Sequence, residues 1–124
     1  MTANDIYNAA AALLFWTEDD KMDYLENVLP ILNKVLQTTF LANNVLREMR
    51  KKEPFSIFEP VANIDGTVEY ENEFLYDILP LGLAGDIGRD DVPEIATALK
   101  TEYEYKISRP IGQGIYETIA EDEE

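Results

Sequence analysis

The 124-residue sequence contains no cysteine and no histidine. Without these residue types the chain forms no disulfide, offers no thiol nucleophile or imidazole base, and holds no zinc ion through sulfur or nitrogen ligands. It also lacks any run approaching the roughly 18 apolar residues of a membrane span, and its start lacks the basic stretch of a signal peptide. We therefore expect a protein made in the cytoplasm, with no membrane partner, no cofactor and no metal.

Positive charge is scarce too, because 10 Lys and Arg residues stand against 25 Asp and Glu residues, which gives a formal net charge of -15. Such a surplus opposes contact with a phosphate backbone, so we expect no direct sequence-specific binding of nucleic acid. Hydrophobic residues nevertheless make up 46% of the chain and aromatic residues 10%. This composition is typical of a folded protein, and the length fits one domain.

Apolar periodicity predicts a mainly α-helical fold, a small bundle of about four helices within residues 1–109. The first helix is an alanine-rich run near residues 4–16. Thr2 and Asp5 precede it with the spacing of a capping box, in which each residue binds the backbone of the other. A second start signal, with a hydroxyl followed by three carboxylates, begins at Thr17.

The longest apolar pattern starts at Met22 and continues to about residue 52. It predicts one long helix, with either a kink or a break at Pro30 because proline removes a backbone donor. Helical spacing returns over residues 72–87, where a proline and glycines favour a bend or an interruption, and again over residues 91–108. Four poor helix formers inside the long pattern should be exposed or bonded to a neighbouring turn: Asn27, Asn33, Asn43 and Asn44.

Residues 61–70 predict one β-hairpin inserted between the helices. Two short segments rich in β-branched residues flank Asp65 and Gly66, a pair that suits a two-residue turn of type I′. We expect the hairpin to pack on the helices or on another subunit, since an isolated hairpin is marginally stable. Three nearby acids, Glu69, Glu71 and Glu73, are assigned to a solvated strand edge.

Four cations gather at the C-terminal end of the long helix, namely Arg47, Arg50, Lys51 and Lys52. They either complement the helix dipole or meet an acidic surface of another copy or partner. Phe55 and Phe58 follow in a proline-flanked loop, where they either fill the core or form an exposed anchor. We treat all six residues as a candidate interface.

Residues 110–124 predict a flexible, acidic C-terminal extension. Its apolar residues alternate like a short strand before the final acids. A donated strand along an adjacent subunit would use four of them, Ile111, Ile115, Tyr116 and Ile119. These four complete the candidate interface.

No residue is assigned a catalytic role. The acidic segment 86–91 lacks the ligand spacing of a calcium loop and is explained by capping of the following helix. The glycines Gly82, Gly85 and Gly88 follow no strand and precede no Lys-Ser or Lys-Thr pair, so they do not form a phosphate loop. An enzyme that depends on carboxylates or a metal is the least favoured alternative.

A pattern of order and spacing over about residues 3–108 resembles small head-tail connector or adaptor proteins of tailed bacteriophages and prophages. It consists of a short alanine-rich helix, a long helix with Leu32-Asn33 and Asn44-Val45-Leu46-Arg47, the stretch Ile78-Leu79-Pro80-Leu81-Gly82-Leu83-Ala84, the turn Asp90-Asp91 and a helix ending Tyr103-Glu104-Tyr105. The resemblance implies a noncatalytic virion protein that docks beneath the portal. It also implies a ring of identical copies with a terminal segment engaging a neighbour.

Two other classes stay open at this point. An acidic protein-interaction module, such as a decoy that mimics the charge of DNA, would also carry the surplus of acids. Its acids would need phosphate-like spacing along one face, whereas many acids of this chain lie at helix starts, where capping explains them. The free protein is expected either as a ring or as a monomer that assembles on contact with its partner.

Overall fold

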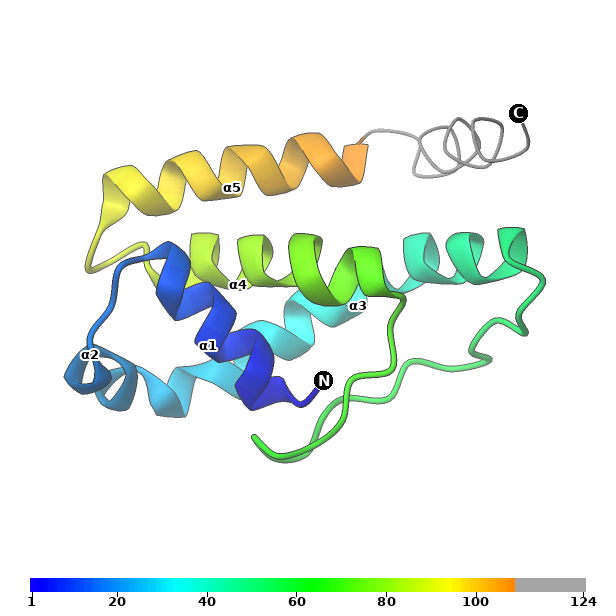
Figure 1. The fold of residues 1–124 in the computed structure, drawn as a ribbon, viewed down its shortest axis with the longest axis horizontal. Coiled ribbons are helices and arrows are strands. Elements are labelled where there is room, and N and C mark those ends of the chain that lie inside the picture. The colour runs from blue at the N-terminus through cyan, green and yellow to red at the C-terminus, as the bar shows by residue number, and fades with distance from the viewer. Residues whose placement is uncertain (109–124) are drawn as a thin grey trace.

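The structure, a computed structural model, describes residues 1–108, and these residues form helices joined by short turns and one long irregular segment (Figure 1). The expectation of a mainly helical domain is confirmed. In chain order the elements are α1 (Ala3–Leu13), α2 (Glu18–Asp23), the 3-10 helix η1 (Leu25–Asn27), α3 (Val28–Met49), the π-helix η2 (Phe74–Ile78), α4 (Leu79–Ile87) and α5 (Pro93–Ser108).

The predicted capping box at Thr2 is present, and the predicted helix start at Thr17 forms a second one. The Asp5 backbone N–H donates to Thr2 Oγ1 over 3.1 Å, and the Thr2 N–H donates to Asp5 Oδ2 over 2.9 Å. Thr17 and Asp20 repeat the arrangement at the start of α2, over 3.2 and 2.9 Å. Each box satisfies donors that the first turn of a helix leaves without an acceptor.

The long helical pattern is broken ahead of Pro30 and not at it. Helix α2 ends at Asp23, a 3-10 turn follows, and α3 then runs from Val28 without interruption to Met49. Pro30 is the third residue of α3, where a backbone N–H has no acceptor within the helix, so proline costs nothing there. The break places Pro30 in the first turn of α3, where its missing N–H breaks no helical hydrogen bond.

A second interruption, over residues 72–87, is also confirmed. The residues Phe74–Ile78 wind as a π-helix, and α4 begins immediately afterwards with Pro80 near its start. In a continuous α-helix the ring of Pro80 would clash with the carbonyl of Tyr76, four residues earlier. The wider π turn changes the position of that carbonyl.

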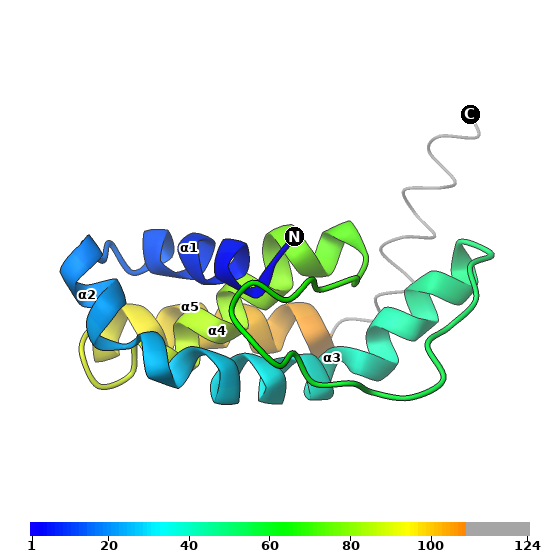
Figure 2. The same ribbon diagram turned by 90° about the horizontal axis from the view of Figure 1, so that it is seen from below.

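Helix α4 lies at the centre of the bundle and contacts α1, α3 and α5 (Figures 1 and 2). Nearly all of its side chains are buried. Gly82 allows the close approach, because a β-carbon there would lie 2.8 Å from the Tyr103 ring of α5 and 2.9 Å from Val35 Cγ1 of α3. The three helices therefore meet across a residue that has no side chain.

The predicted β-hairpin over residues 61–70 is wrong, since the described part of the chain contains no strand. Neither Asp65 nor Gly66 has the positive φ that a type I′ turn requires. Instead, Asn63 Oδ1 accepts from the Asp65 N–H over 3.0 Å and closes a local turn. The flanking segments are therefore not aligned to pair with each other.

These segments pair with the start of the chain. Thr2 and Thr67 form an isolated antiparallel bridge. The Ala3 N–H donates to the Gly66 carbonyl over 2.9 Å, and the Val68 N–H donates to the Met1 carbonyl over 2.8 Å. The N-terminus thus occupies the place that the hairpin partner was expected to take.

The four candidate interface residues of the extension, Ile111, Ile115, Tyr116 and Ile119, lie outside the described residues, as does the whole range 110–124. None of the helices within residues 1–108 has the length and apolar character needed to cross a membrane.

Candidate interaction surfaces

Three of the four predicted cations converge on one buried carboxylate, Glu71. Lys52 Nζ lies 2.9 Å from Glu71 Oε1, Arg50 Nη1 lies 3.2 Å from the same oxygen, and Arg47 Nη1 lies 3.4 Å from Oε2. Arg50 also binds Glu73 through its Nη2 atom over 2.7 Å. These cations therefore join the end of α3 to the segment before η2.

The assignment of Glu71 to a solvated edge is wrong. Its side chain is 5% exposed, and its backbone N–H donates to Oδ1 of the buried Asn43 over 2.9 Å. Burial by itself raises the pKa of Glu71, but hydrogen bonds and charge from Lys52 and Arg50 outweigh it and lower the pKa below its ordinary value. The sequence separates these partners by about twenty residues, so no local pattern revealed the cluster.

Two asparagines of α3 hold the irregular segment through paired hydrogen bonds. Asn44 Nδ2 donates to the Phe55 carbonyl and Asn44 Oδ1 accepts from the Phe55 N–H, both over 2.9 Å. Asn33 makes the same pair of bonds with the Val61 backbone: its Nδ2 donates to the carbonyl over 3.0 Å and its Oδ1 accepts from the N–H over 2.8 Å. The side-chain amides thus imitate a neighbouring strand, and the expected bond to a neighbouring segment is confirmed for both residues.

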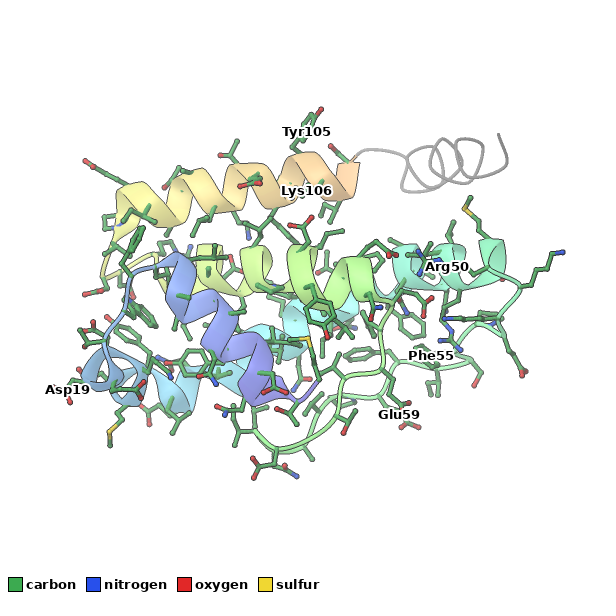
Figure 3. The ribbon with its side chains drawn as sticks, in the orientation of Figure 1. Asp19, Arg50, Phe55, Glu59, Tyr105 and Lys106 are labelled. Atoms are coloured by element: carbon green, nitrogen blue, oxygen red, sulfur yellow. The ribbon has the colours of Figure 1, made fainter. Side chains whose placement is uncertain are left out.

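Phe55 and Phe58 are half-buried and pack against α3 and its neighbourhood (Figure 3 labels Phe55). The guanidinium carbon of Arg47 lies 4.2 Å from the centre of the Phe55 ring, and Phe58 meets Phe40 edge-on at 6.0 Å. A cavity of about 270 Å³ lies beside these rings. Both aromatic residues therefore serve packing first.

A second surface, which sequence reasoning missed, lies at the opposite end of the molecule, around Asp19 in Figure 3. We call it the acidic corner. It consists of the link from α1 to α2, the residues as far as η1 and the turn before α5: Phe15, Trp16, Asp20, Met22, Asp23, Tyr24, Leu25, Asp90 and Asp91.

Phe15 is the most exposed aromatic anchor of the acidic corner, with 82% of its surface accessible. Its φ of 58° is left-handed. The Phe15 N–H donates to the Ala12 carbonyl and the Trp16 N–H to the Ala11 carbonyl, over 3.2 and 3.0 Å. This pair of bonds is the Schellman motif that ends many helices, and it places Phe15 where glycine is preferred because a β-carbon is strained there.

Trp16 and Tyr24 give the acidic corner a rigid base. Their rings stack at 4.7 Å, and Trp16 Nε1 donates to Asp91 Oδ2 over 2.9 Å. Burial raises the pKa of Tyr24, and the carboxylates of Asp91, Asp90, Asp23 and Asp20 raise it further. Carboxylates from two distant segments thus surround one aromatic pair.

Two buried tyrosines, Tyr7 and Tyr103, have raised pKa values. Burial raises the pKa of Tyr7 and of Tyr103 to about 12, so both keep their protons at neutral pH. The Tyr7 hydroxyl donates to the Lys21 carbonyl over 2.6 Å and joins α1 to α2. Within residues 1–108, no three acidic side chains gather in an arrangement that could hold a metal ion.

Comparison with known proteins adds no relative. No family model, no curated protein and no solved structure matches the chain.

Proposed function

We propose that this protein is a noncatalytic structural component of a tailed bacteriophage or prophage, a connector or adaptor that docks with the portal or with neighbouring copies in a ring. The sequence resemblance over residues 3–108 is one support. The other is the acidic corner, which displays large apolar side chains on a rigid helical frame. A surface of this kind is suited to binding another protein.

The observation that carries the proposal is the conformation of Phe15. A left-handed backbone costs an L-residue about 1 kcal/mol, and an exposed phenyl ring gains nothing from the core in return. The helix end requires a left-handed residue at this position but does not require phenylalanine, and non-glycine residues in this conformation cluster at functional sites. Docking of the ring into a pocket of a partner would explain why phenylalanine stands where glycine is preferred.

Charge indicates what that pocket is like. Phe15 and Met22 are close in the chain to Trp16 and Tyr24, whose stacked rings lie near carboxylates of α2 and of the turn before α5. A partner that accepts them would therefore offer an apolar pocket with a basic rim, since complementary charge favours the correct orientation. In this proposal residues 110–124 engage a neighbouring subunit once the ring has formed.

Electron microscopy of the purified chain mixed with portal rings encoded in the same genome tests the proposal. We expect an additional ring of density on one face of the portal. Portal rings that remain bare, together with failure to bind any head or tail protein of that genome, would contradict it.

A second candidate, the acidic decoy, is favoured by the gathering of Asp20, Asp23, Asp90 and Asp91 in one place. A decoy would bind a nuclease or repressor and compete with its DNA. It would depend on charge, so Phe15→Ala would leave its binding unchanged while high salt would abolish it. The connector proposal instead predicts that Phe15→Ala weakens binding to the partner.

A further inference from the structure

An apolar stripe lies uncovered on the C-terminal half of α3. Leu41 is 75% exposed and Val45 is 48% exposed, while Met49 continues the spacing of four and is half-buried. This half of α3 projects beyond the end of α5 in both views (Figures 1 and 2). Nothing within residues 1–108 shields the two exposed side chains from water.

The described chain ends beside the start of this stripe. Ile107 of α5 and Thr38 of α3 line the same cleft, and Lys106 is held by Asp77 over 2.7 Å. Helices α3 and α5 point in the same direction in Figure 1, so the C-terminal end of α5 points toward the exposed half of α3. Leu41 lies about one turn beyond Thr38.

The sequence after Ser108 matches the C-terminal half of α3 in both apolar spacing and charge. Isoleucines recur every four residues, at 111, 115 and 119, which is the spacing of Leu41, Val45 and Met49. Four acids end the chain, Glu121, Asp122, Glu123 and Glu124. At the matching end of α3 stands the exposed residue Lys51.

The lengths agree as well. The 13 residues from Thr38 to Lys51 rise roughly 20 Å along α3. The 12 residues from 109 to 121 span roughly 18 Å as a helix and up to roughly 40 Å when extended. The acidic end therefore reaches Lys51 in either conformation.

We propose that in the free protein residues 110–124 fold back in cis onto α3. The isoleucines cover Leu41 and Val45, and the terminal acids lie against Lys51. This contact hides an apolar stripe that would otherwise face water, and it holds whether or not the chain is a virion protein.

Disulfide trapping tests the proposal directly, because the chain has no native cysteine and every disulfide is an engineered one. A chain carrying Val45→Cys and Ile115→Cys is oxidised at low concentration and analysed on a nonreducing gel. We expect a fast-migrating monomer with an internal disulfide. The matched control carries Met22→Cys and Ile115→Cys, which places the first thiol at the far end of the molecule, and it should stay unlinked.

Hydrogen exchange of the full chain provides the second readout. We expect protected amides within residues 110–120, and loss of that protection in the double variant Leu41→Asp and Val45→Asp, whose exposed positions tolerate substitution. The variant Met22→Asp should keep it. Disulfides only between chains, no disulfide at all, or protection unaffected by the α3 substitutions would overturn the proposal.

Discussion

At the scale of single residues, the two non-glycine positions with left-handed backbone within residues 1–108 share one origin. Phe15 and Lys51 have φ values of 58° and 60°, and each follows the C-cap of a helix. At Lys51 the Lys52 N–H donates to the Arg47 carbonyl over 2.8 Å, the same Schellman bond that Trp16 makes after α1. Strain at both sites is therefore set by how the helices end.

Phe15→Gly is predicted to stabilise the fold. Glycine removes the steric cost of the left-handed conformation, so the free energy of unfolding should rise by about 1 kcal/mol, measured by urea denaturation. The control is Phe15→Ala, which deletes the ring but keeps the β-carbon and should not stabilise. A glycine variant less stable than the alanine variant would show that the backbone at this turn is unstrained.

Glu71→Gln is predicted to destabilise the fold at neutral pH. It removes the charge that three cations share, and the free energy of unfolding should fall by about 2 kcal/mol at pH 7. Because the folded state lowers the pKa of Glu71 from 4.5, the contribution is complete above that value and is lost as the pH falls through the lower pKa of the folded protein.

The difference between wild type and Glu71→Gln should therefore shrink between pH 7 and pH 3 in urea titrations. Subtracting the variant removes the effect of the other carboxylates, which titrate in both proteins. A difference that stays constant over this range would contradict the ion cluster.

At the scale of elements, the irregular segment after α3 depends on asparagine side chains. Asn44→Ala removes both hydrogen bonds to Phe55 and is predicted to cost about 2 kcal/mol, since each bond contributes about 1 kcal/mol. Limited proteolysis should then cut within residues 53–61 faster than in wild type. Asn27→Ala is the matched control, because Asn27 precedes α3 with no side-chain cap bond.

Local signals were readable from the sequence because their partners are close in the chain. Thr2 with Asp5 and Thr17 with Asp20 are three residues apart, and helix starts followed from them. The hairpin prediction was wrong because the partner of its segments is distant in the chain. Its segments found a partner about sixty residues away, at Thr2, and no periodicity within 61–70 reports on that.

The candidate interface also combines residues that the sequence located with partners that it did not reveal. The sequence located four cations at the end of α3, but their acceptor Glu71 lies in another element, so their intramolecular role was not apparent. The acidic corner was missed because Asp20 and Asp91 come near the same residue, Tyr24, only in the folded chain. The signal available was phenylalanine at a helix end that favours glycine.

At the scale of the whole molecule, charge and apolar surface are distributed unevenly. Cations at the end of α3 are largely neutralised by Glu71 and Glu73, whereas the carboxylates of the acidic corner surround an aromatic pair at the other end. The protein thus presents one end where Glu71 and Glu73 pair with most of the cations, and another where carboxylates lie near a stacked aromatic pair. The second end is the surface that we propose docks with a partner.

The most direct test of this account is sedimentation velocity of portal rings mixed with wild type or with Phe15→Gly. Wild type should sediment with the rings. Phe15→Gly, which is predicted to be folded and more stable, should remain in the slow fraction because it lacks the anchoring ring. Equal cosedimentation of the two proteins would contradict the claim that the acidic corner docks through Phe15.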